Sequence, residues 1–205
     1  MIPEPIQPIS QEEAASTLDE IDRIGRQMRR AVAAGCAAPM LILWGSIWIV
    51  GFTAEQFFPY ADRYWLVLDL VGLAVSCFLG AWSRKSPVKG PGRGRIGLSW
   101  LILFGFAILW SLLWYPTGLV YGARWVAYGP LLERKMAVFW VTVCMFAYMI
   151  MGLWLDRFLL WLGAAVTVAT LIGFALAPHF LFLWIAVSGG GALVTVGAVI
   201  RKSWR

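Results

Sequence analysis

The chain has 205 residues, of which 60% are hydrophobic and 14% charged, and its formal net charge is +6. Soluble domains are about a quarter charged and about half apolar, so this balance excludes an ordinary soluble protein and indicates a membrane protein. The basic residues lie at the ends of apolar runs. The positive charge therefore points to anionic lipid headgroups on the cytoplasmic side as partners, and not to nucleic acid.

Residues 1–34 are expected to form a cytoplasmic extended tail and an amphipathic helix, ahead of a transmembrane domain over residues 35–205. Ser10 and Glu13 have the spacing of a capping box, which marks the start of a helix. The apolar residues that follow at helical spacing are Leu18, Ile21, Ile24, Met28 and Val32. Five acids precede four arginines, which suits the helix dipole and turns the basic end toward the membrane. We expect a helix on the lipid surface, and the alternative is a docking helix for a partner.

Five apolar stretches follow, and they predict an all-α polytopic membrane protein with six transmembrane helices. The expected spans are residues 38–57, Tyr64–Trp82, the first part of Ile96–Ala123, Met136–Leu155 and two helices within Phe158–Ile200. Pro39 suits the first turn of the first span. The last stretch carries no formal charge and is about twice as long as a helix that crosses ~30 Å of hydrocarbon. It must therefore fold back once, and Ala177–His179 is the expected turn.

The basic stretch Ser83–Arg95 sets the expected orientation. It contains no acid and five basic residues, which are Arg84, Lys85, Lys89, Arg93 and Arg95. Such loops stay on the cytoplasmic side, so both termini are expected inside, in the inner (plasma) membrane. This arrangement places thirteen of the 17 Lys and Arg residues inside. The literal G-x-G-x-x-G of Gly92–Gly97 opens a membrane span, and no acid follows it before Glu133, so we interpret it as unrelated to dinucleotide binding.

Asp69 is the only acid inside an expected span, and an ionisable group at membrane depth is a candidate for proton or cation coupling. Because it lies early in its helix, Arg63 or interfacial water could neutralise it, and a structural hydrogen bond or ion pair is the favoured interpretation. His179 is the sole histidine, which excludes bis-histidine haem and multi-histidine metal sites within the chain. Single cysteines in or beside apolar runs, Cys36, Cys77 and Cys144, predict buried thiols.

A glycine run places Gly189, Gly190 and Gly191 in the middle of the last expected span. Small residues also recur four apart as Gly163/Thr167, Ala165/Ala169, Gly173/Ala177 and Gly191/Thr195. We favour close packing of the fifth span on the sixth, or a contact between copies. The alternative is an unwound segment whose free carbonyls line a substrate site, as in transporters with broken helices.

Three weaker patterns complete the sequence. Within Pro116–Arg134, the stripe Tyr121, Trp125 and Tyr128 predicts a short interfacial helix outside the membrane. Leu41–Gly45 resembles Leu101–Gly105, a hint of parallel repeats, although an apolar alphabet gives short matches easily. Tryptophans near the span ends are expected to form an aromatic belt, and they are Trp44, Trp65, Trp82, Trp114, Trp154 and Trp184.

The sequence contains no cluster of His, Asp, Glu or Cys for acid–base or metal chemistry, so neither enzymatic activity nor a cofactor is expected. We expect a non-enzymatic integral membrane component, such as an accessory or interaction subunit or a sensor of a membrane assembly. A protein partner or a second copy would contact its small-residue helix faces. The alternative is a small transporter or channel, as a monomer or an oligomer, that uses Asp69 and Gly189–Gly191.

Overall fold

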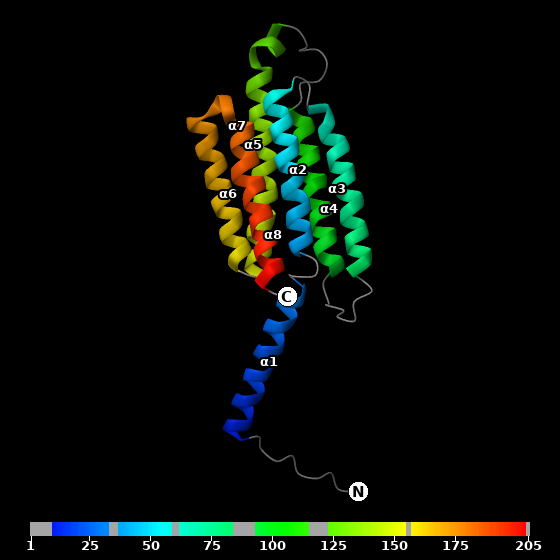
Figure 1. Cartoon of the computed structure of the whole chain (residues 1–205), viewed down its shortest axis with the longest axis vertical. Helices are drawn as coiled ribbons and strands as arrows, with labels where there is room; N and C mark the ends of the chain where they lie inside the picture. Colours follow the sequence, from blue (N-terminus) through cyan, green and yellow to red (C-terminus); the bar gives the residue numbers. More distant parts are fainter. Residues whose placement is uncertain are drawn as a thin grey trace.

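The computed structural model describes residues 10–32, 37–58, 62–83, 93–114, 123–154 and 157–203. Within these ranges the chain is almost entirely helical and contains no strand (Figure 1). The helices in chain order are α1 (Gln11–Val32), α2 (Ala38–Phe57), α3 (Asp62–Ser83), α4 (Arg93–Trp114), α5 (Ala123–Trp154) and α6 (Arg157–Leu176). The last helical stretch consists of η3 (Pro178–Phe180), α7 (Leu181–Ile185), η4 (Ala186–Gly190) and α8 (Gly191–Ser203).

Five helices in the described part of the chain are long and apolar enough to cross a membrane. Their apolar segments are Ala38–Phe57, Tyr64–Ala81, Gly129–Leu153, Arg157–Leu176 and Pro178–Lys202. The remaining expected span corresponds to α4, whose described apolar part, Gly97–Leu112, is shorter than the others. An all-helical chain with several membrane-length apolar helices is therefore confirmed.

The bundle is built around two helix pairs. α5 packs along α6, and α2 packs along the last helical stretch, α7 to α8. α3 joins this core chiefly through α2, and α4 joins it chiefly through α5. α1 projects away from the end of the bundle, as the blue helix in Figure 1 shows.

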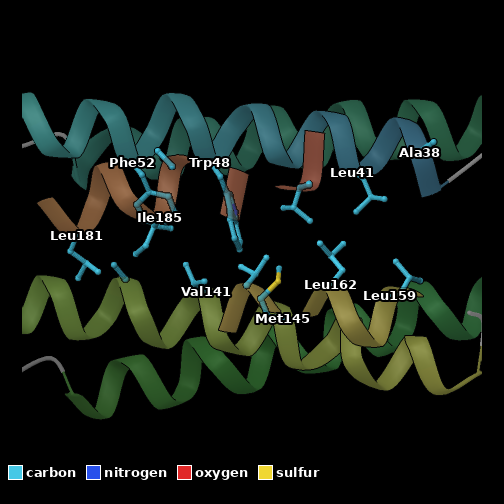
Figure 2. Close-up of a cluster of buried hydrophobic side chains, with 14 of the residues drawn as sticks. Ala38, Leu41, Trp48, Phe52, Val141, Met145, Leu159, Leu162, Leu181 and Ile185 are labelled. Atoms are coloured by element: carbon cyan, nitrogen blue, oxygen red, sulfur yellow. The ribbon is translucent and has the colours of Figure 1, made fainter. Parts of the chain in front are cut away.

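The core lies where these pairs meet. Leu41, Val141, Met145, Leu181 and Ile185 are completely or almost completely buried. Figure 2 shows side chains of α2 pointing toward those of α5. Around them lies a continuous cluster of buried side chains drawn from α2, α5, α6, α7 and α8. Close packing of apolar side chains stabilises such a core. It therefore sets the relative positions of the helices that contribute side chains to it.

The predicted start of α1 is confirmed in atomic detail. The Glu13 backbone N–H donates to Ser10 Oγ at 3.1 Å, and the Ser10 N–H donates to Glu13 Oε2 at 3.4 Å. This reciprocal pair is the capping box that the sequence predicts. The helix that follows leaves Leu18, Ile21 and Ile24 exposed.

The fold-back between the last two spans lies where the sequence predicts it. α6 ends at Leu176, and η3 turns the chain over Pro178–Phe180 into α7. The glycine run is not unwound, because Ala186–Gly190 forms one π-helical turn between α7 and α8. A π-turn inserts one extra residue into an otherwise continuous helix.

The expected separate interfacial helix within Pro116–Arg134 is wrong for its described part. α5 begins at Ala123 and runs without interruption for 32 residues, with Pro130 inside it. A proline removes one backbone hydrogen bond, and the helix-forming residues that follow carry the helix through. Tyr121 lies outside the described residues, and the side chains of Trp125 and Tyr128 do as well.

Candidate functional site

Two tryptophans join α2 and α3 in a reciprocal contact. The Trp65 ring of α3 lies against Gly51 of α2, where an added Cβ would sit 2.7 Å from the ring. The Trp44 ring of α2 lies against Gly72 of α3, where the corresponding distance is 3.0 Å. Only glycine leaves room for an indole this close to the helix axis.

Each indole also donates its N–H across the same interface. Trp65 Nε1 donates to Glu55 Oε2 at 2.8 Å, and Trp44 Nε1 donates to Ser76 Oγ at 3.2 Å. In both cases the acceptor lies four residues after the glycine that receives the ring. A buried indole N–H needs such a partner, because leaving it unpaired in apolar surroundings costs free energy.

The sequence carries a signal for this contact in the shared spacing of the residues that form it. Trp44, Gly51 and Glu55 have the same spacing as Trp65, Gly72 and Ser76. Steps of seven and four residues keep all three positions on one helix face. The aromatic-belt interpretation is therefore wrong for Trp44 and Trp65, whose rings fill a helix–helix interface.

Trp184 also forms a specific contact. Its ring covers Gly173 of α6, and its Nε1 donates to the Ala169 carbonyl oxygen at 2.8 Å. This hydrogen bond ties α7 to α6 next to the fold-back. The side chains of the other three expected belt residues, Trp82, Trp114 and Trp154, lie outside the described residues.

Asp69 lies about 10 Å along the axis of α3 from its first residue, at 1.5 Å per residue. Its side chain is exposed and forms no hydrogen bond or ion pair with any described side chain. The side chain of Arg63, the expected partner, lies outside the described residues. A carboxyl group without a partner at this depth is the most unusual polar feature of the described bundle.

The Asp69 carboxyl group lies within electrostatic range of the Cys144 thiol of α5, and Cys144 lies within range of Tyr148, one turn further along α5. Trp100 of α4 meets the Tyr148 ring edge-on, with centroids 5.6 Å apart. Asp69 of α3 thus lies within electrostatic range of a side chain of α5, which the spacing of these residues in the sequence does not predict.

The cysteines differ from the expectation of buried thiols. Cys144 is half-buried, whereas Cys77 is exposed on α3, and both are free. Cys77 is exposed because α3 packs on the bundle chiefly through the face that contacts α2. Cys36 lies outside the described residues.

The glycine run contacts a different face of α2. A Cβ on Gly190 would lie 2.9 Å from the Gly45 carbonyl oxygen, and a Cβ on Gly45 would lie 2.8 Å from the Gly190 carbonyl oxygen. Gly189 lies against the Trp48 ring, whereas Gly191 has no neighbour within 4 Å. The last helix therefore packs backbone to backbone on α2. Six residues along α2 separate Gly45 from Gly51, so the glycine run and α3 meet α2 on different faces.

Of the small residues predicted to pack the fifth span on the sixth, Gly173 does so and Gly163 does not. Gly163 lies against Met145 and Met149 of α5, and Gly173 receives Trp184. Thr195 and Ala165 are exposed. The main partner of α6 is thus α5, and the main partner of the last helix is α2.

The proposed resemblance between the first and third spans does not extend to packing. Gly45 is buried against Gly190, but Gly105 has no neighbour within 4 Å. α4 instead meets α5 through stacked aromatic rings, with Phe104 and Trp140 centroids 6.2 Å apart. The two matching pentapeptides therefore perform different roles.

Gln56 holds the fold-back onto α2. Its Nε2 donates to the His179 carbonyl oxygen at 2.9 Å, and the Leu183 N–H donates to its Oε1 at 3.4 Å. His179 contributes only a backbone acceptor to these bonds, and its side chain is exposed. Within the described ranges no group of three or more His, Cys, Asp or Glu residues could hold a metal ion.

The basic stretch adds no geometry to the site. Arg84, Lys85 and Lys89 lie outside the described residues. Arg93 and Arg95 belong to the first turn of α4, but their side chains are not described.

No protein-family model, curated protein or solved structure matches the chain. Any statement about function must therefore come from its own residues. The two features that invite one are the exposed apolar stripe of α1 and the carboxyl group of Asp69, which has no partner among the described side chains.

Proposed function

We propose that the chain is a non-enzymatic integral membrane component that holds a protein partner at a membrane. The observation that carries this proposal is the apolar stripe of α1, on a helix that stands away from the bundle (Figure 1). Leu18, Ile21 and Ile24 are 65%, 59% and 45% exposed. Full burial of such a side chain is worth about 1.5–3 kcal/mol, so a partner that covers all three gains substantial free energy.

The proposed topology has six spans with both termini on the cytoplasmic side of the inner (plasma) membrane. α4 supplies the third span in chain order and completes the set of six, since its 22 residues extend for about 33 Å. The excess of Lys and Arg on one side supports this orientation, with Arg84, Lys85, Lys89, Arg93 and Arg95 at the lipid headgroups. Reporter fusions after Arg205 and within Gly90–Gly92 test it. If a reporter that works only on the outer side of the membrane is active at either position, the proposed topology is wrong.

The interaction proposal is tested by purifying the tagged full chain from its native membrane in a mild detergent. A partner should co-purify in a fixed ratio, and Leu18→Glu/Ile21→Glu should release it. Ala15→Glu/Ser16→Glu adds the same charge off the stripe and leaves Leu18, Ile21 and Ile24 in place, so it should keep most of the partner. Circular dichroism must show equal helix content for both variants. Failure of any partner to co-purify with the wild-type chain would refute the proposal.

A second candidate function is proton or cation coupling at Asp69. The observation that favours it is a carboxyl group that lies within a membrane-length helix and has no partner among the described side chains. Asp69→Asn keeps the shape and removes the charge. Ion-dependent flux into proteoliposomes that survives this substitution would rule out the second candidate.

A further inference from the structure

The first half of α1 carries acidic residues and no basic ones. Residues 11–22 contain five acids and no base: Glu12, Glu13, Asp19, Glu20 and Asp22. The four arginines of the helix all follow this segment. Leu18 and Ile21, the two most exposed members of the stripe, therefore lie in a strongly negative part of the chain.

Two of these acids border the apolar stripe. Glu20 is four residues before Ile24, and Asp22 is four residues after Leu18, so on a helix each position lies next to a position of the stripe. They lie on opposite sides of the stripe. Glu20 pairs with Arg23 at 3.2 Å, but both side chains are more than half exposed, so this pair screens little of the charge. Glu12 and Asp19 belong to the opposite face.

This charge pattern fits neither the membrane surface nor a second copy of α1. Helices that lie on membranes carry basic residues beside their apolar face, because the headgroups of the cytoplasmic leaflet are anionic. Acids at both borders of the stripe would be repelled there. A second copy of α1 would bring the same negative borders together, and like charges across an interface oppose pairing.

We infer that the stripe is a docking site for a protein whose apolar groove is lined by Lys or Arg along its edges. The inference rests on the proposed function and names the chemistry of the partner. Leu18, Ile21 and Ile24 are the anchors, at the spacing by which helices enter apolar grooves. Glu20 and Asp22 pair with the basic edges and set the orientation of the helix in the groove.

The first part of the test asks whether lipid covers the stripe. A fluorophore is attached at Leu18→Cys in the full chain, with Cys36, Cys77 and Cys144 replaced by Ser. The chain is reconstituted in nanodiscs of phosphatidylcholine alone and of phosphatidylcholine mixed with phosphatidylglycerol. Neutral acrylamide should quench the probe equally in both. Protection from acrylamide in either nanodisc would show that the membrane covers the stripe and would overturn the inference.

The second part uses a photo-crosslinking amino acid at position 18 of the full chain in its native cells. A discrete adduct is expected from position 18 and none from position 16, which lies on the opposite face. Glu20→Lys/Asp22→Lys should lower the adduct yield about tenfold or more, since like charges would then face each other across the interface. Glu12→Lys/Asp19→Lys changes the net charge by the same amount on the opposite face and should lower the adduct yield little.

The outcomes separate the inference from the proposed function. If the partner co-purifies but Glu20→Lys/Asp22→Lys leaves the adduct unchanged, the inference is wrong and the proposed function stands. An adduct with the mass of two chains, or no adduct from position 18, also overturns the inference. If no partner co-purifies with the wild-type chain, both fail.

Discussion

Gly190 and Gly191 are neighbours in sequence, yet alanine should affect stability in opposite directions at the two positions. At Gly190 the new methyl group would lie 2.9 Å from the Gly45 carbonyl oxygen and 3.0 Å from the Ile49 nitrogen. Both atoms belong to the backbone of α2 and cannot turn aside as a side chain can. At Gly191 the methyl group would meet nothing within 4 Å.

The magnitudes follow from these distances. Overpacking a closely fitted interface costs about 1–3 kcal/mol, and alanine recovers about 1 kcal/mol of helix propensity relative to glycine. Because backbone atoms cannot turn aside, the upper part of this range applies, and Gly190→Ala should destabilise the bundle by about 1–2 kcal/mol. Gly191→Ala should stabilise it by about 0.5–1 kcal/mol. For a chain of this size, 1 kcal/mol corresponds to a Tm shift of about 2–4 °C.

The assay is thermal unfolding of the purified protein in one detergent, followed by size-exclusion chromatography after heating. Gly191→Ala is expected to have the highest Tm, the wild type an intermediate Tm and Gly190→Ala the lowest. Equal stability of the wild type and Gly190→Ala would refute the close approach of α2 and the last helix. Loss of stability in both variants would show that Gly191 also has no room for a side chain or requires the backbone freedom of glycine, as in an unwound segment.

Three further predictions concern single hydrogen bonds. Trp65→Phe keeps most of the ring but removes the donor to Glu55, so it should destabilise the bundle by about 1–2 kcal/mol in the same unfolding assay; unchanged Tm would contradict the bond. Gln56→Leu removes both bonds to the fold-back and should cost about 1–3 kcal/mol, whereas equal proteolysis rates at the fold-back in variant and wild type would argue against this role. Ser10→Ala should lower the helix content of α1 through a loss of about 1 kcal/mol, measured by backbone amide exchange over residues 11–16, and unchanged protection there would contradict the cap.

Features that depend on neighbouring residues were predictable from the sequence. The capping box fixed the start of α1 because Ser10 and Glu13 satisfy each other's backbone groups without outside help. Pro39 lies in the first turn of α2, and Pro178 lies in the turn between the last two spans, as expected from the restricted backbone of proline. The lengths of the apolar runs similarly predicted membrane-length helices.

Which helix packs on which was not predictable in the same way. Apolar side chains of similar size fit many neighbours, so the composition of a span does not specify its partner. The small residues indicated close packing correctly, and Gly173 meets the sixth span as expected, but Gly190 meets α2 and Gly163 meets α5. The surroundings of Asp69 escaped prediction for the same reason, because Cys144 lies on a helix far along the chain.

The paired indole contacts between α2 and α3 also restrict how the bundle can move. Each ring fits one glycine on the other helix, so a slide of one turn, about 5.4 Å, would drive both rings into larger side chains at once. The two helices are thus locked in register and should travel as a single rigid hairpin. α4, which touches the bundle chiefly along α5 through stacked rings, carries no such lock. Any sliding of one element past another during the working of this protein is therefore expected at α4.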